Sequence, residues 1–147
     1  MGIGNPYMHD DAIGLEVASE LRKRRLGETV VVYDYQAMDL SLLMYFKDAS
    51  KIVLIDALKA GEIPGTVSKY SVPVSKEQLP NLPSHHEMQL YEIVDLARQT
   101  GVLECPIVIV GVEPKDCSPG EGLSFEVNEA LPKAINAVLK ELNLPGE

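Results

Sequence analysis

Short runs of apolar, mostly β-branched residues alternate along this chain with segments of helical periodicity. Three such runs, at 29–33, 51–56 and 107–111, lack the strict polar alternation of a strand with one face in water. Runs of this kind are typical of strands covered on both faces, as in a parallel sheet between helices. The pattern therefore predicts an α/β domain of three layers, with a twisted, mostly parallel sheet between helices.

Helical spacing and capping residues locate the other elements. Asp39 is a suitable N-cap for a short helix, and Pro132 suits the first turn of a helix better than its interior. Residues 66–72 alternate more clearly than the buried runs, which indicates an edge strand that could run antiparallel and so make the sheet mixed. We expect helices, in order, at 11–26, 40–46, 88–100 and 132–142.

Length and charge limit the classes of function. A chain of 147 residues is most simply one domain, 1–147, and a net charge of -9 argues against a nucleic-acid partner. No apolar run approaches the ~20 residues that a membrane span requires. Cys105 and Cys117 form neither a CxxC pair nor a ladder of disulfides, so a reducing, cytoplasmic location is expected, with no membrane association.

The stretch from Gly2 to Gly14 combines a glycine turn with two adjacent carboxylates, Asp10 and Asp11, that open a helical pattern. Such a turn normally follows a strand, and here almost nothing precedes it. Either the first strand is truncated or the assigned start is late, and we expect the sheet to lack a strand that its relatives have. For the acidic pair, one interpretation is structural, with Asp10 capping the helix and Asp11 facing its dipole. The other makes one of them a ligand or a base.

Parallel strands place their carboxyl ends at one edge of the sheet, where sites of α/β proteins form. Asp56 ends a predicted strand, and Glu113 follows another. Ser84-His85-His86-Glu87 has the spacing of a capping box ahead of the helix at 88–100, which puts His86 in the first turn. Singly, each has an ordinary structural explanation. Together, Asp11, Asp56 and His86 are two carboxylates and one imidazole, which suit nickel, iron, manganese or zinc better than calcium.

Other assignments remain open on spacing alone. His85 and His9 are alternative imidazoles, and Asp11 with Asp56 could form an aspartic dyad. A receiver-type phosphoacceptor site would use the acidic pair, Asp56 and Lys115, but Lys115 follows a proline instead of preceding one. A serine or cysteine protease is disfavoured, because no GxSxG motif occurs and Cys105 adjoins a buried strand.

The whole set of motifs resembles the hydrogenase maturation proteases, which trim the C-terminal extension of the large subunit of nickel-iron hydrogenases. The resemblance runs in order through nearly the entire chain. The motifs are Gly2-x-Gly4-Asn5, Asp10-Asp11-x-x-Gly14, Ile55-Asp56-Ala57, Pro64-Gly65-Thr66-Val67, Ser84-His85-His86-x-x-x-Leu90, Gly111-Val112-Glu113-Pro114 and Gly120-Glu121-Gly122-Leu123-Ser124.

The resemblance implies a mixed five-stranded sheet and a metal site of Asp11, Asp56 and His86, which would also be the catalytic residues. The nickel would arrive in the hydrogenase large-subunit precursor, bound by cysteines of that substrate, and these three residues would complete its coordination. The enzyme, a monomer, would thus cut only precursor that has received its metal. An alternative that keeps the metal site is a nickel-binding assembly factor that holds the precursor without cutting it.

Overall fold

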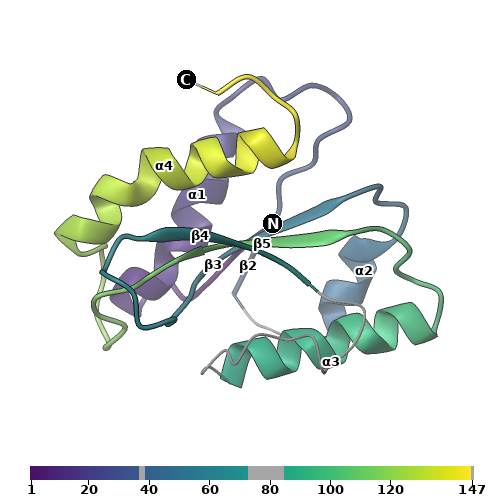
Figure 1. Cartoon of the computed structure of the whole chain (residues 1–147), viewed down its shortest axis with the longest axis horizontal. Coiled ribbons are helices and arrows are strands. Elements are labelled where there is room, and N and C mark those ends of the chain that lie inside the picture. Colours follow the sequence, from purple (N-terminus) through teal and green to yellow (C-terminus); the bar gives the residue numbers. More distant parts are fainter. Residues whose placement is uncertain (37–38, 73–84, 147) are drawn as a thin grey trace.

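The computed structural model describes residues 1–36, 39–72 and 85–146, of which 85–91 are described by their backbone alone. Within these residues, a five-stranded sheet lies between helices on its two faces (Figure 1). The strands are β1 Gly2–Ile3, β2 Asp34–Tyr35, β3 Ile52–Ala57, β4 Val67–Ser71 and β5 Ile107–Val112. The helices are the 3-10 turns η1 His9–Ala12 and η2 Leu40–Leu42, and the α-helices α1 Ile13–Arg22, α2 Leu43–Phe46, α3 His85–Gln99 and α4 Phe125–Glu141.

The strands are arranged in the order β2-β1-β3-β5-β4. Strands β2, β1, β3 and β5 are parallel, and β4 pairs antiparallel with β5 at the edge. The predicted mixed, mostly parallel sheet is therefore confirmed, as is the antiparallel edge strand. The sheet does not lack a strand: β1 is present between β2 and β3, although it is only two residues long.

Each face of the sheet carries its own hydrophobic core, because successive side chains of a strand point to opposite faces. Val53 and Ile55 of β3 pack with residues of α1 and α4. Leu54 of the same strand joins the second core, formed with α2 and the described side chains of α3. All three side chains are buried, as expected for the continuous apolar run. Figure 1 shows these helix pairs on the two sides of the sheet.

Helix α1 lies against the sheet at a distance that only glycine permits. A Cβ atom added to Gly14 would lie 2.2 Å from the Ile3 carbonyl oxygen and 2.3 Å from that of Ile55. A Cβ atom on Gly2 would lie 1.9 Å from the Gly14 carbonyl oxygen. The two glycines thus bring the first turn of α1 onto the carboxyl ends of β1 and β3, where the acidic pair precedes it.

The predicted strand at 29–33 is wrong. The strand begins only at Asp34, and Val31 is 64% exposed. A strand needs a neighbour, and β1 supplies one only from Gly2, which pairs with Asp34. Residues 29–33 therefore have the composition of a strand, but no neighbouring strand pairs with them.

The start of the last helix is also corrected. We expected it at Pro132, but α4 begins at Phe125 and contains Pro132. Interior proline costs about 3 kcal/mol through one lost hydrogen bond and a clash. Val127 and Ala130 lie on the same buried stripe as Ala134 and Val138, so continuing the helix buries a longer apolar face. Burial of a side chain the size of valine contributes roughly 1.5–3 kcal/mol, which offsets that cost.

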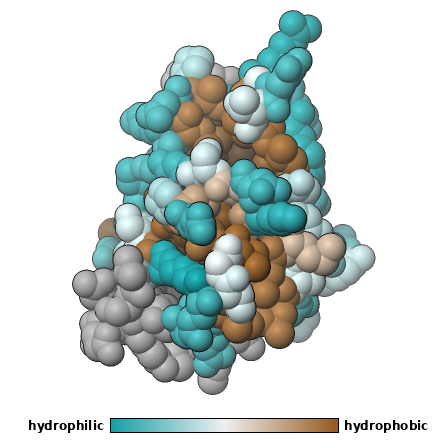
Figure 2. Space-filling view, turned by 90° about the vertical axis from the view of Figure 1, so that its right-hand side faces the viewer, coloured by the Kyte–Doolittle hydropathy of each residue, from teal (hydrophilic) through white to brown (hydrophobic). Residues whose placement is uncertain are grey.

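The other helices follow the sequence with shifted ends: α1 spans 13–22 instead of 11–26, and α3 spans 85–99 instead of 88–100. The Asp39 carboxylate accepts from the Ser41 backbone N–H at 2.8 Å, so the predicted N-cap is confirmed. The backbone of His85 and His86 forms the start of α3, while the Ser84 capping box falls outside the described residues. Among the described residues, no helix is both long and apolar enough to cross a membrane. Figure 2 shows the side turned to the right in Figure 1, where hydrophobic areas reach the surface between hydrophilic groups.

Candidate functional site

Acidic residues of three segments lie at or just after the carboxyl ends of parallel strands. Asp11 lies in η1, which follows β1 and contacts β3. Asp56 is the penultimate residue of β3, paired in register with Gly111 of β5. Glu113 follows the last residue of β5. The topology therefore puts Asp11, Asp56 and Glu113 on segments at the carboxyl ends of parallel strands.

The Asp11 carboxylate is oriented by the glycine turn. Its Oδ2 accepts the Asn5 backbone N–H at 2.8 Å, and Asn5 Oδ1 in turn accepts the Tyr7 backbone N–H at 3.0 Å. Gly4 has a φ of 152°, and a Cβ atom there would lie 1.9 Å from the Asp11 carbonyl oxygen. The turn therefore fixes Asp11 at a half-buried position. Asn5 is a positioning group that we did not single out from its spacing.

Asp56 is almost fully buried, with 8% of its surface exposed. Its Oδ1 accepts the backbone N–H of Ala57 at 2.8 Å. A buried carboxylate is favourable only with such partners, because desolvation of the charge is costly. Its place at the end of a central strand, next to the edge that carries Asp11, is a common setting for functional groups in α/β proteins.

Asp10 has a different role from the helix cap that we considered. The residue before η1 is Met8, and no side chain caps this turn. Asp10 is instead fully buried, and its two oxygens accept the backbone N–H groups of Lys115, Asp116 and Ser124 at 2.6–2.9 Å, and the Ser124 hydroxyl at 2.9 Å. Burial by itself raises the pKa of Asp10, but these hydrogen bonds outweigh it and lower that pKa.

Backbone contacts join the segment 115–124 to the turn before α1. His9 N–H donates to the Gly120 carbonyl at 2.9 Å, and Gly120 N–H donates to the Tyr7 carbonyl at 2.9 Å. The His9 ring lies against this segment, with Nδ1 3.0 Å from the Gly122 carbonyl oxygen. A Cβ atom on Gly120 would lie 2.0 Å from Nε2 of His9. His9, one of the alternative imidazoles, thus packs on the loop that Asp10 holds.

The receiver-type interpretation is not supported by these contacts. Lys115 Nζ forms an ion pair with Glu126 Oε1 at 2.7 Å, which raises the pKa of Lys115. Asp10 accepts from backbone groups, whereas Asp11 accepts from Asn5. The acidic pair therefore does not face one common cation, and Lys115 is held by a residue of α4.

Glu113 and the two cysteines have structural contacts or surroundings that explain them. Glu113 is buried, and its Oε2 accepts the Ala60 backbone N–H at 2.7 Å, which links the segment after β3 to the end of β5. Cys105 and Cys117 are free thiols, as expected, and burial raises the pKa of both. A thiol with a raised pKa is a poor nucleophile, so neither cysteine fits the role of a catalytic thiolate.

The histidine of the predicted ligand set cannot be placed from its side chain. His86 is the second residue of α3, and its ring lies outside the description, as does that of His85. Among the described side chains, no group of three histidine, cysteine, aspartate or glutamate residues is arranged to hold a metal ion. The set of Asp11, Asp56 and His86 therefore stays a prediction.

Fold and site together define an α/β protein whose candidate site lies at the carboxyl edge of a mostly parallel sheet and offers carboxylates instead of a thiolate. The sequence pattern of the hydrogenase maturation protease family matches residues 15–141. The chain belongs to this family, and so to the hydrolases that act on peptide bonds.

Relatives of known description agree with this assignment. A Methanocaldococcus jannaschii protein of the same family is 32% identical, with 97% of this chain and 94% of that protein aligned. The hydrogenase 2 maturation protease of Escherichia coli is 27% identical over 99% of this chain and 90% of its own length. The structure of the hydrogenase maturating endopeptidase HybD from E. coli superposes with a TM-score of 0.85 at 26% identity, covering 97% of this chain and 89% of HybD.

Proposed function

We propose that this protein removes the C-terminal extension from the large-subunit precursor of a nickel-iron hydrogenase after nickel insertion, and that Asp11, Asp56 and His86 bind the nickel carried by that precursor. Family membership supports the coarser part, a peptidase that acts on a hydrogenase large subunit. The observation that carries the finer part is the placement of two carboxylates on neighbouring segments at one sheet edge, each with an oxygen held by a backbone N–H.

The chemistry of these groups fits a divalent ion that arrives with the substrate. Carboxylate and imidazole suit nickel, and three protein ligands leave positions for groups of the precursor. Asp56 is nearly buried and Asp11 is half-buried, so Asp11 is the more accessible of the two to a metal that arrives with the substrate. A site that is incomplete without the substrate's own ligands would respond only to metal-loaded precursor.

The carboxylates also supply the chemistry for hydrolysis. A divalent ion next to the scissile bond polarises its carbonyl or lowers the pKa of a water. A carboxylate that is not a metal ligand can accept the proton of the attacking water, provided that it lies within hydrogen-bond reach. Asp11 or Asp56 would take this role only if that residue is not itself ligated to the metal, and Asp11 is the more accessible of the two.

The test is to incubate the protein with purified large-subunit precursor, either loaded with nickel or free of it, and to follow the mass of the precursor. We expect loss of a C-terminal peptide from the nickel-loaded form alone. Equal cleavage of both forms would refute metal recognition while leaving the peptidase activity intact. No cleavage of either, with stable binding of the loaded form, would favour a non-proteolytic assembly factor.

Single substitutions test the role of each of the three residues in processing. Asp11→Asn, Asp56→Asn and His86→Ala should each reduce processing at least ~10²-fold if the side chain takes part in acid–base or metal chemistry. Asp95→Asn is the matched control, because this α3 carboxylate accepts only a local hydrogen bond from Gln99 among the contacts that the structure shows for it. Circular dichroism should be unchanged in all four, and full activity of any of the first three removes that residue from the proposed site.

A further inference from the structure

Three large apolar side chains are exposed on segments that follow the carboxyl ends of parallel strands. Tyr7 follows β1 and is 65% exposed, Ile63 lies between β3 and β4 and is 78% exposed, and Phe125 is the first residue of α4 and is 76% exposed. Figure 1 shows the turn before α1, the β3–β4 connection and the start of α4 at the left-hand end of the molecule. We call these three side chains the apolar rim.

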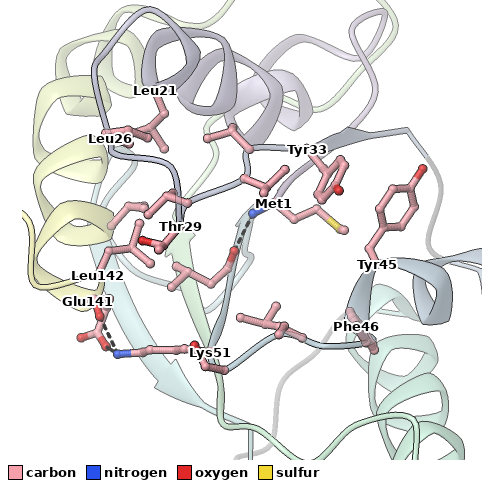
Figure 3. A pocket seen from close by; sticks show the side chains of 18 of the residues that line it. Met1, Leu21, Leu26, Thr29, Tyr33, Tyr45, Phe46, Lys51, Glu141 and Leu142 are labelled. Carbon is pink, nitrogen blue, oxygen red and sulfur yellow. Dashed lines mark hydrogen bonds and ion pairs between the residues drawn. The ribbon is translucent and has the colours of Figure 1, made fainter.

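Other exposed apolar side chains lie far from the candidate site. Tyr33 lines a pocket of about 480 Å³ at the amino ends of the strands, where β3 begins (Figure 3). Met44 is exposed on α2, which precedes β3. These residues belong to the opposite end of the sheet from Asp56, so they do not contribute to the apolar rim. Met44 therefore serves as a matched control residue.

Tyr7 is connected to the residue that orients Asp11. The Tyr7 N–H donates to Asn5 Oδ1 at 3.0 Å, and the Asn5 N–H donates to Asp11 Oδ2 at 2.8 Å. The Tyr7 carbonyl accepts the Gly120 N–H at 2.9 Å. The backbone of Tyr7 is therefore held through both its N–H and its carbonyl, and one residue links it to a carboxylate of the candidate site.

The loop of Ile63 packs on the start of α4. The Ile63 carbonyl accepts the Thr66 N–H at 3.0 Å, which closes a turn, and Gly65 within this turn has a φ of 83°. A Cβ atom on Gly65 would lie 2.5 Å from the carbonyl oxygen of Glu126, the residue after Phe125. Ile63 and Phe125 thus lie on two segments whose backbones touch.

The start of α4 is also joined to the acidic pair. The Ser124 N–H donates to Asp10 Oδ1 at 2.6 Å. Phe125 follows Ser124 in the chain and Asp11 follows Asp10, so Phe125 and Asp11 are the next residues on the two sides of this hydrogen bond. The apolar rim is therefore continuous with the candidate site through backbone contacts.

Exposed aromatic and aliphatic side chains on a fixed backbone are typical anchors of protein interfaces. A few such residues carry most of the binding energy of an interface, because each buries a large apolar area. A backbone that is already ordered loses little conformational freedom when the partner binds. The three side chains of the apolar rim meet both conditions.

Charge restricts what the apolar rim can bind. The protein has a net charge of -9, and the exposed acids Glu62, Asp116 and Glu121 lie on the loops after β3 and β5. Like charges oppose contact with a second copy of this chain or with an anionic lipid surface. A different protein fits better, provided that its contact face is apolar and has a neutral or basic margin.

We propose that the apolar rim is the docking surface for the hydrogenase large-subunit precursor, and that it binds an apolar face of this substrate beside the segment that carries the nickel. This inference rests on the proposed function. It adds a contact that does not involve the metal, so the rim supplies affinity for the precursor while the nickel decides whether the precursor is cut.

The test compares Tyr7→Ser, Ile63→Ser and Phe125→Ser with wild type on two forms of the precursor. For the nickel-free form we measure Kd, and for the nickel-loaded form the enzyme concentration that gives half-maximal single-turnover cleavage. Each substitution should raise both values roughly tenfold. The factor should be the same for the two forms, because the lost contact does not involve nickel. Met44→Ser should change neither value, and circular dichroism should show all four variants folded.

The results separate failure of the docking surface from failure of the proposed function. Wild-type cleavage with unchanged values in the three variants would overturn the docking surface and leave the function standing. An effect on the nickel-loaded form alone, or no binding of the nickel-free form by wild type, would also overturn a contact independent of the metal. Absence of both binding and cleavage of either form by wild type would overturn both proposals.

Other occupants are tested with the same variants. Dimers of the wild type in ultracentrifugation that disappear in the variants would assign the apolar rim to a second copy and overturn the proposal. Binding to phosphatidylcholine vesicles that is lost in the variants would assign it to a lipid surface, with the same consequence. If nickel-loaded precursor is bound but not cut, the peptidase part of the proposed function fails, and a tenfold weaker Kd in the variants still supports the docking surface.

Discussion

Replacement of Asp10 by asparagine tests how the two halves of the site are joined. The carboxylate accepts four hydrogen bonds, one on Oδ1 from Ser124 N–H and three on Oδ2. An asparagine side chain could place its single acceptor oxygen at the Oδ2 position, but its NH₂ group would then oppose the Ser124 N–H. Hydrogen bonds to charged groups contribute about 1.5–3 kcal/mol each and neutral ones less, so we expect Asp10→Asn to cost roughly 3–5 kcal/mol.

The assay is urea denaturation of wild type and Asp10→Asn at pH 7 and below pH 4. Since the folded pKa of Asp10 is below the ordinary 3.8, its contribution is complete above that value and is lost as the pH falls through the folded pKa. The difference between the two proteins should therefore shrink as the pH drops, because a protonated Asp10 presents the same conflict as asparagine. Asp95→Asn is the control. A difference below ~0.5 kcal/mol at pH 7, or one independent of pH, would refute this reasoning.

Two further substitutions or modifications follow from close contacts and from burial. Gly14→Ala should destabilise the fold by several kcal/mol, because the alanine Cβ would lie 2.2 Å from the Ile3 carbonyl oxygen. This cost exceeds the gain of about 1 kcal/mol that alanine offers over glycine inside a helix. Glu16→Ala, at an exposed position of the same helix, is the control, and equal urea midpoints for the two variants would contradict the close approach. Stability should rise from pH 5 to pH 8 by about 1.4 kcal/mol per unit from Met1 alone, since its amine is neutral when folded and protonated when unfolded in that window. Acetylation of Met1 should abolish this part of the slope, and an unchanged slope would show that the amine is not buried.

The sequence predicted the parts of the fold that local periodicity determines. The continuous apolar run of β3, the alternation of β4 and the Asp39 cap all have local causes, and all three were located correctly. The run 29–33 was misassigned because a strand also requires a neighbour, and β1 starts too late to be one. Pro132 was misjudged because tertiary burial of α4 outweighs a local preference.

The candidate site was predictable in its place but not in the roles of its residues. The carboxyl edge of a parallel sheet follows from topology, so Asp11 and Asp56 could be assigned to one region. That Asp10 is fully buried could not be inferred, because its partners are backbone N–H groups of residues more than a hundred positions away. Asn5 holds Asp11 through its backbone N–H, a contact that does not depend on the side-chain type, so the sequence does not reveal it.

The two neighbouring aspartates illustrate how a buried structural residue can control a functional one. Consecutive residues of a 3-10 turn point about 120° apart, since such a turn has 3.0 residues. With Asp10 held by backbone groups of the segment 115–124, the carboxylate of Asp11 points in a different direction and accepts the Asn5 N–H. Loss of the Asp10 contacts would free η1 to rotate, and Asp11 would move with it. A folded Asp10→Asn protein should therefore process nickel-loaded precursor more slowly than wild type although Asp11 is unchanged, and full activity in that variant would show that Asp11 is positioned by the glycine turn alone.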